Sequence, residues 1–414
     1  MKIAFYIHHT AMSAGGIFTY SVGILRQLIQ SPRIENLLII TSKQVSKTLG
    51  EFSKNDKVEI KVVDRQKFIV KLMLIIWYGL NTTIIIIQTI LPVKNPFKIL
   101  KQYFTKLNPY QNIVESSEID ILHVPMQYSP IYHTKVPVII TMHDLQEYHF
   151  PEYFTLRARL HRFINNRMAI FDSDHIIVSF DHIKNDIQTN FKVEEKKISV
   201  CPVPVADNWF VASGETNWEN LKAKYDLQKI FLLYPAATWQ HKNHIRLIEV
   251  LHRLLQDDID VNLVCTGNKT GYFPTIERKI AELGVGEKIK FLGIIPEEDL
   301  IGLYKNCELV VIPTLYEAGS GPLYEAMRYA CPVICSNVTS LPDTVSNDEF
   351  VFDPKNLNEL EEKIILGIND KEFRKRNIEN SRKRIEQFAN MNFSFPFVNV
   401  YNSLIETDNK SNSS

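Results

Sequence analysis

The sequence predicts an α/β protein made of two doubly wound domains. Its 414 residues are too many for one ordinary hydrophobic core and about right for two domains. Two successive series of short apolar runs alternate with helical patterns, as in parallel sheets that carry helices on both faces. The extended, proline-containing segment 201–207 separates the two series. We therefore expect a first domain over residues 1–205 and a second over residues 206–389, facing each other across a central cleft.

The strands and helices are predicted from hydrophobic periodicity. In the first series, strands are expected at residues 3–7, 37–41, 58–63, 121–124, 136–142 and 175–179, with helices at 18–30 and 154–171. In the second series, strands are expected at residues 231–235, 261–266, 289–292, 309–312, 333–335 and 350–352, with helices at 243–256, 272–283, 297–305, 323–329, 357–368 and 371–388. A final helix at about 390–406 is expected to pack back on the first domain, and the polar tail 407–414 to be disordered.

Composition and charge limit the classes of protein to which this sequence can belong. Hydrophobic residues make up 45% of the chain and charged residues 23%, the proportions of a soluble globular protein. No secretory signal pattern opens the sequence, so a cytoplasmic location is expected. Residues 1–205 carry 24 Lys and Arg against 17 Asp and Glu, although the net charge of the whole chain is zero. Since no base-reading motif accompanies this positive charge, a nucleic-acid partner is not expected.

The excess positive charge lies largely in residues 61–114, where eight bases face one acid, Asp64. This segment contains an uncharged apolar run, residues 72–91, that is long enough to span a bilayer. Polar residues at 79–83 interrupt the run, so a spanning helix, a buried pair of helices and a membrane-surface helix all remain open. The flanking lysines favour peripheral contact with the anionic inner face of the cell membrane.

The most informative motif follows the strand predicted at 309–312. Two carboxylates, Glu317 and Glu325, flank a small-residue loop, and Pro322 stands where the first turn of a helix would begin. A loop that leads into a helix N-terminus offers backbone N–H groups and a positive dipole end to a phosphate. Carboxylates beside it can accept hydrogen bonds from sugar and ribose hydroxyls.

Three further elements follow predicted strands. Lys242, next to Asn243 at the start of a helix, could neutralise a diphosphate. Gly15 and Gly16 would let the backbone approach a ligand closely, but they equally suit any tight turn. His143 and Asp144 end a strand on the side where ligands bind, and His143 could donate to a phosphate or a sugar hydroxyl. The histidines and acids show no metal-binding pattern, so no metal and no other cofactor is expected.

Taken together, these motifs resemble those of glycosyltransferase family 4, the glycosyl transferases of group 1. Glu317-x7-Glu325, His241-Lys242-Asn243 and the later Phe291-Leu-Gly293 stand in the family's order. The resemblance implies the GT-B fold and retaining transfer of a hexose, mannose among the candidates, from a GDP- or UDP-linked sugar to a glycan or lipid-linked acceptor in polysaccharide or glycolipid assembly.

The resemblance also implies residue roles. Lys242 would neutralise the donor diphosphate, Glu317 would accept from the transferred sugar, and Glu325 would accept from the ribose. Other predicted donor-binding residues are Asn243, Gly293, Ile294, Gly319, Ser320 and Gly321, while Gly15, Gly16, His143 and Asp144 would act from the acceptor side. The catalytic candidates are Glu317, Lys242 and His143.

This sequence departs from the family pattern in two places. The loop after Glu317 reads Ala-Gly-Ser-Gly-Pro where Gly-Phe-Gly-Leu-Pro is usual, and no arginine stands near Ala236. Two alternatives therefore stay open. One is an isomerase of the same fold, such as a nucleotide-sugar 2-epimerase, and the other is a non-catalytic protein that binds nucleotide sugars.

Overall fold

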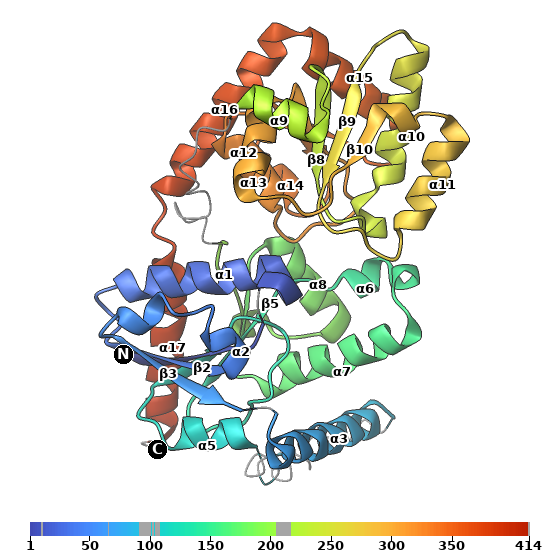
Figure 1. The fold of residues 1–414 in the computed structure, drawn as a ribbon. Helices are drawn as coiled ribbons and strands as arrows, with labels where there is room; N and C mark the ends of the chain where they lie inside the picture. Colours follow the sequence, from blue (N-terminus) through green and yellow to red (C-terminus); the bar gives the residue numbers. More distant parts are fainter. Residues whose placement is uncertain are drawn as a thin grey trace. The chain divides into compact units, whose positions relative to one another are not determined.

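The computed structural model describes residues 1–9, 11–64, 66–90, 101, 103, 108–203 and 217–412. The chain forms two compact units. Unit 1 comprises Met1–Pro204 together with Asn392–Ser414, and unit 2 comprises Val205–Met391. Residues 204–207 of the predicted interdomain segment lie outside the described ranges. Each unit has its own parallel sheet (Figure 1).

The sheet of unit 1 has seven parallel strands in the order β3-β2-β1-β4-β5-β6-β7. Their bounds are β1 Lys2–Ile7, β2 Asn36–Ser42, β3 Val58–Val63, β4 Ile121–Val124, β5 Val138–Met142, β6 His175–Val178 and β7 Ile198–Val200. The six strands predicted in this half are confirmed. The sequence pattern missed β7, because three residues are too few to show a period. The strand order reverses direction between β1 and β4, which makes this pair the topological switch point of the unit.

The helices of unit 1 are α1 Ala11–Gln30, α2 Lys43–Ser46, α3 Phe68–Ile90, α5 Pro109–Glu115, α6 Gln146–His149, α7 Leu156–Asp172, α8 Asp181–Phe191 and α17 Ser394–Asn412. Helix α1 begins at Ala11, and the sequence pattern placed its start at residue 18. Gly15 and Gly16 therefore lie in the first turns of a helix, where we expected a loop. An added Cβ at Gly16 would meet no atom within 4 Å, so close packing does not require glycine there.

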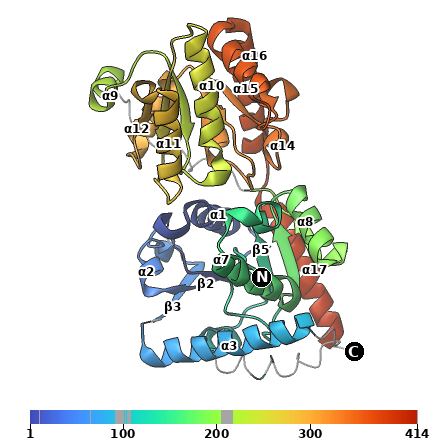
Figure 2. The same ribbon diagram turned by 90° about the vertical axis from the view of Figure 1, so that its right-hand side faces the viewer.

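Helix α17 belongs to the core of unit 1, although it is the last helix of the chain. Its residues Phe397, Val398 and Tyr401 are buried in the same cluster as the β1 residues Ile3 and Phe5. Figures 1 and 2 show this helix running alongside unit 1. Helix α17 spans Ser394–Asn412, so it begins and ends later than the predicted helix at 390–406 and includes residues 407–412 of the tail predicted to be disordered.

Helix α17 is also anchored by a buried histidine. The Nδ1 atom of His123 lies 2.7 Å from the Tyr401 hydroxyl, and its Nε2 atom lies 2.8 Å from Thr141 Oγ1. Burial lowers the pKa of His123 to about 3, so the ring is neutral at physiological pH. The contact therefore joins neutral groups.

Helix α3 is one continuous helix of 23 residues, which excludes the predicted pair of helices. The polar residues expected to break it bond within the helix. Asn81 Nδ2 donates to the Trp77 carbonyl at 2.8 Å, and Thr83 Oγ1 donates to the Gly79 carbonyl at 2.9 Å. It is long and apolar enough to cross a membrane by length and composition alone, yet only 22% of its most apolar window is buried. The helix packs on α7 in unit 1 (Figure 2).

The bases of the segment 61–114 are placed in different surroundings. Arg65, Lys94, Lys98 and Lys106 lie outside the described residues. Lys101 is buried, and its Nζ lies 2.7 Å from the carboxylate of Asp172. Lys67 and Lys71, beside and within the first turn of α3, are exposed.

The sheet of unit 2 has six parallel strands in the order β10-β9-β8-β11-β12-β13. Their bounds are β8 Phe231–Pro235, β9 Asn262–Thr266, β10 Ile289–Phe291, β11 Leu309–Ile312, β12 Val333–Ser336 and β13 Val351–Phe352. The helices are α9 Trp218–Tyr225, α10 His244–Gln256, α11 Phe273–Leu283, α12 Glu297–Asn306, α13 Gly321–Arg328, α14 Leu341–Val345, α15 Leu357–Asn369 and α16 Lys371–Ala389. The predicted strands and helices of this half are confirmed within about two residues at each end. The switch point lies between β8 and β11.

Candidate functional site

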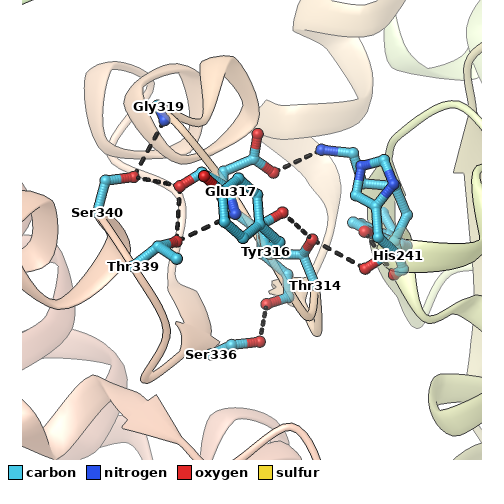
Figure 3. Close-up of polar contacts among 11 residues, drawn as sticks. His241, Thr314, Tyr316, Glu317, Gly319, Ser336, Thr339 and Ser340 are labelled. Carbon is cyan, nitrogen blue, oxygen red and sulfur yellow. Dashed lines mark hydrogen bonds and ion pairs between the residues drawn. The ribbon is translucent and has the colours of Figure 1, made fainter. Parts of the chain in front are cut away.

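The switch point of unit 2 brings Lys242 and Glu317 together. Lys242 ends a 3-10 turn, Gln240–Lys242, after β8, and Glu317 lies in the loop after β11. Because β8 and β11 are hydrogen-bonded neighbours, their following loops meet at the same edge of the sheet. The Lys242 Nζ lies 2.5 Å from Glu317 Oε2, and the two side chains are only 18% and 12% exposed. Figure 3 shows Glu317 within a network of polar contacts that includes Thr339.

The loop that carries Lys242 is held by its backbone. The Tyr234 hydroxyl donates to the Lys242 carbonyl at 2.8 Å. The His241 carbonyl accepts from the backbone amide of Leu315 at 2.7 Å and from Thr314 Oγ1 at 3.1 Å. These bonds join the loop after β8 to the loop after β11, so the lysine is positioned before any ligand arrives.

Asn243 also helps to connect the loop after β8 with the loop after β11. Its backbone has a φ of +60°, a conformation that asparagine tolerates better than most residues. Its buried amide donates to the Pro313 carbonyl at 2.9 Å and to the Pro354 carbonyl at 3.3 Å. Because both amide hydrogens are engaged, this side chain joins the two loops, and only its carbonyl oxygen could take the donor-binding role predicted for Asn243.

Two hydroxyl residues after β12 hold the Glu317 loop, and the sequence analysis assigned them no role. Thr339 Oγ1 accepts from the Glu317 amide at 3.0 Å and donates to the Glu317 carbonyl at 2.6 Å. Ser340 Oγ accepts from the Gly319 amide at 3.0 Å and lies 3.1 Å from the same carbonyl (Figure 3). Gly319 adopts a φ of +105°, which its lack of a side chain permits. Its amide, predicted to contact the donor, is therefore paired with Ser340.

Helix α13 begins directly behind this loop. The amides of Ser320 and Gly321 precede its first hydrogen-bonded turn, so the helix itself does not use them. Pro322 occupies the first turn, as predicted. Unused N–H groups at a helix N-terminus can bind a phosphate.

Glu325, one turn into α13, is partly buried. The Tyr304 hydroxyl, from α12, donates to Glu325 Oε2 at 2.6 Å. Burial raises the pKa of Glu325, and the bond from Tyr304 opposes this shift. The bond from Tyr304 uses one carboxyl oxygen and leaves the other, Oε1, to accept a hydroxyl hydrogen when the group is ionised. Sequence analysis did not find Tyr304, because it is distant along the chain and belongs to no motif.

The predicted base-facing stretch lies at the end of β10. Gly293 has a φ of +71°, and its carbonyl accepts from the Gly267 amide at 2.7 Å. Gly267 in turn has a φ of +110°, and an added Cβ would lie 2.7 Å from the Ala236 carbonyl carbon. Only glycine fits there, which lets the loops after β8, β9 and β10 approach one another. Ile294 is 82% exposed, so its side chain is available to a ligand.

The remaining predicted residues lie in unit 1. His143 follows β5, and its Nε2 lies 3.0 Å from the Pro125 carbonyl. Since a carbonyl can only accept, Nε2 carries the hydrogen, and burial lowers the pKa of the ring. A neutral ring in this tautomer offers a lone pair at Nδ1, so it can accept from a sugar hydroxyl. The expected donation to a phosphate does not fit this geometry.

Asp144 is engaged in an ion pair with Arg162, which also contacts Glu147 at 2.7 Å. A pair of histidines that sequence analysis overlooked, His8 and His9, follows β1 with ring centroids 4.3 Å apart. Burial, followed by the charge of His143, lowers the pKa of His9 to about 4. Among the described residues, no group of three or more His, Cys, Asp or Glu is arranged to hold a metal ion.

Two doubly wound parallel domains, each with a switch point at the carboxyl ends of its strands, are the architecture of the GT-B fold. Solved structures agree. The chain matches a glycosyltransferase from Rickettsia africae with a TM-score of 0.67, at 19% identity over 98% of both chains. It matches Anabaena HepE, solved in complex with UDP and glucose, with a TM-score of 0.65, at 18% identity over 98% of this chain and 100% of the other.

Two models of glycosyltransferase families match the chain. Residues 217–384 match the glycosyl transferases of group 1, and residues 79–208 match glycosyltransferase family 4. Both halves of the chain therefore match models of glycosyltransferases. It is 27% identical to the O-antigen chain mannosyltransferase B of Escherichia coli over 69% of this chain and 74% of that protein. It is 25% identical to the O-antigen chain mannosyltransferase RfbU of Salmonella typhimurium over 54% of this chain and 59% of that protein.

Proposed function

We propose that the protein is a retaining hexosyltransferase, moving mannose from a GDP- or UDP-linked sugar to a glycan or lipid-linked acceptor in polysaccharide assembly. The Lys242–Glu317 pair at the β8/β11 switch point carries this proposal, because it places a cation and a hydroxyl acceptor 2.5 Å apart beside the N-terminus of α13. The mannosyltransferases of Escherichia coli and Salmonella typhimurium among its relatives support the choice of sugar.

In the proposed reaction, an acceptor hydroxyl attacks the anomeric carbon of the donor sugar. At the same time the bond between that carbon and the diphosphate oxygen breaks. The hydroxyl proton passes to the departing phosphate, so no protein base is needed. Lys242 and the amides of Ser320 and Gly321 stabilise the charge that develops on the leaving group. These groups supply positive charge without a metal, so we expect turnover to persist in a chelator.

The two carboxylates divide the recognition of the donor. Glu317 accepts from hydroxyls of the transferred sugar, while Lys242 moves from Glu317 to the diphosphate as the donor binds. Glu325 accepts from the ribose, and the Tyr304 hydroxyl keeps its carboxylate oriented. The Anabaena HepE structures with UDP and with UDP-glucose support a nucleotide-sugar donor for this fold.

The proposal includes a peripheral location on the inner face of the cell membrane. Trp77, Asn81, Ile84 and Ile85 bury one side of α3 in unit 1. Apolar residues on the opposite side stay exposed, and they are Phe68, Ile69, Leu72, Ile75, Ile76, Ile86 and Ile90. We call these seven residues the outward stripe. A helix buried on one side and apolar on the other suits the membrane surface better than a full crossing.

The donor experiment tests the reaction. The purified protein is incubated with GDP- and UDP-linked sugars, and both thermal shift and released nucleoside diphosphate are followed, with and without a chelator. We expect one donor to stabilise the protein and to be hydrolysed slowly, and Glu317→Ala to abolish release. Stabilisation without release would indicate a non-catalytic binding protein, and conversion of the sugar without acceptor or release would indicate an isomerase.

The membrane experiment is independent of turnover. The double substitution Phe68→Ser and Ile90→Ser removes two of the most exposed members of the outward stripe. We expect this variant to stop pelleting with anionic phospholipid vesicles while its thermal unfolding stays unchanged. Ile230→Ser, at an exposed isoleucine of unit 2, is the matched control. Unchanged pelleting of the double variant would contradict the peripheral location.

A further inference from the structure

The switch point of unit 1 contains a cavity that the proposed donor site does not use. Its volume is about 830 Å³, large enough for a drug-sized ligand. Four aromatic side chains and two basic ones line it, and they are Tyr6, Trp77, Tyr78, Tyr128, His8 and Lys71. The described residues that line it include no Asp or Glu, so Lys71 faces no opposing charge there.

The cavity lies where a doubly wound sheet binds ligands. Tyr6 and His8 are at the carboxyl end of β1, and Tyr128 is in the loop that follows β4. Strands β1 and β4 are the neighbours between which the strand order reverses. Unit 1 therefore has a hollow at the position equivalent to that of the Lys242–Glu317 pair in unit 2.

Helix α3 forms one wall of this cavity, and its contacts keep that wall in place. Trp77 is buried and stacks on Tyr132, with ring planes 8° apart. Asn165 of α7 donates to the Tyr78 hydroxyl at 3.1 Å and to the His161 carbonyl at 2.7 Å. The aromatic lining is thus tied to α7, so the hollow is part of the folded unit.

The rim of the cavity connects it with the outward stripe. Ile75 lines the cavity and is also 60% exposed as a member of the stripe. Gly79, one turn further along α3, lines the cavity as well, and an added Cβ there would meet nothing within 4 Å. An aliphatic chain could pass from the cavity over Gly79 onto the apolar side of α3 without leaving an apolar surface.

We propose that this cavity binds a lipid-linked acceptor. The phosphate group of the acceptor pairs with Lys71, the aromatic walls contact its first sugar and the start of its chain, and the chain leaves over Gly79 along α3. This assignment rests on the proposed transferase function for its biological role. It selects the lipid-linked acceptor over a free glycan, because a soluble glycan would not need the apolar rim.

The test is calorimetric titration of the full-length protein with farnesyl phosphate below its aggregation concentration, beside farnesol and inorganic phosphate. Gly79→Leu fills the rim, and leucine forms helices better than glycine, so the variant should fold. We expect it and Lys71→Gln each to weaken farnesyl phosphate binding by about tenfold or more. Lys71→Arg should keep most of the affinity. Ile86→Ser, on the outward stripe but away from the cavity, should bind as the unchanged protein does.

Each outcome decides the proposal. The proposal is overturned if the unchanged protein does not bind farnesyl phosphate, or if Gly79→Leu binds it with unchanged affinity. Binding of inorganic phosphate as tightly as farnesyl phosphate would overturn it too. Loss of binding in Ile86→Ser as well would assign the ligand to the stripe and not to the cavity, which also overturns it. Stabilisation by a nucleotide sugar reports on unit 2 separately, so failure of the donor site and failure of the acceptor cavity are distinguishable.

Discussion

The two sheets have the same kind of switch point but different chemistry at it. In unit 2 the site is polar and assembled by hydrogen bonds, with Lys242 and Glu317 held between the loops after β8 and β11. In unit 1 the corresponding position is a hollow with aromatic walls and one side made by α3. Topology thus decides where a ligand binds, while the loops decide which ligand it is.

The difference is the one expected for the ligands proposed at the two sites. A diphosphate needs charges and amides that are in place once the donor is bound, since reorganising them during the reaction would cost rate. An amphiphile needs surface more than orientation, and aromatic rings provide large apolar area with few rotatable bonds.

Lys242→Ala should have the largest effect. Removing the cation that stabilises the leaving diphosphate should cost at least about 2–3 kcal/mol of transition-state stabilisation, or a fall in kcat of about 30- to 150-fold. The measurement is release of nucleoside diphosphate under saturating donor. Arg246→Ala is the control, since that arginine is 44% exposed and paired with Glu249. If Lys242→Ala kept an activity near that of the unchanged protein, Lys242 would not stabilise the leaving diphosphate, and the contrast between a charged site in unit 2 and an apolar one in unit 1 would fail.

Ser340→Ala should have an intermediate effect. The substitution leaves the Gly319 amide without its partner in a site where Ser340 is fully buried, which should cost about 1–3 kcal/mol of unfolding free energy. We also expect kcat to fall, because the loop that carries Glu317 loses an anchor. Denaturant unfolding and turnover measure the two effects. Ser403→Ala, whose hydroxyl bonds only within α17, should change neither. A variant with lost stability and full turnover would show that preassembly of this loop does not matter for the reaction.

The smallest effect is a pH dependence. Because burial raises the pKa of Glu325 above 4.5, lowering the pH through that raised value protonates the group that should accept from the ribose. Donor affinity should therefore weaken on acidification, starting above the usual glutamate range. Tyr304→Phe removes a bond that lowers this pKa, so the weakening should begin at higher pH. Glu325→Gln should abolish it. Titrations of donor binding against pH decide the matter, and an identical profile in all three proteins would contradict the role of Glu325.

The raised pKa of Glu325 also affects the pH dependence of stability, in the direction opposite to its effect on donor binding. The unfolded chain ionises this carboxyl near 4.5, before the folded protein does. The contribution of Glu325 to stability is therefore largest below that pH and declines as the pH rises through the raised value. Binding and stability at this one group thus respond to pH in opposite directions.

Much of unit 2 could be predicted from the sequence because its signals are local. The strand at 309–312, the small-residue loop, Pro322 and the two glutamates are contiguous, and each has a physical reason to be there. The supporting residues could not be found in this way. Thr339, Ser340 and Tyr304 reach the site through the tertiary fold, and no local pattern assigns a role to any of the three side chains.

Unit 1 was predicted less well. Its helices continue through residues that usually interrupt a helix, and the structure around them decides this. Glycines usually interrupt helices, so Gly15 and Gly16 suggested a loop, whereas α1 continues through them. Asn81 and Thr83 suggested a break, whereas each bonds to the carbonyl four residues earlier. The cavity left no sequence signal, since residues from β1, α3, α7 and the loop after β4 form it jointly.

Helix α17 determines the order in which this protein can mature on the ribosome. The residues that complete the core of unit 1 are made after all of unit 2, because Phe397 and Tyr401 follow Met391. Unit 2 is continuous along the chain and can fold as soon as it emerges. Unit 1 must wait, with the apolar face that α17 will cover exposed for the time needed to translate about 190 further residues. The half of the molecule that is synthesised first is thus the half that finishes folding last.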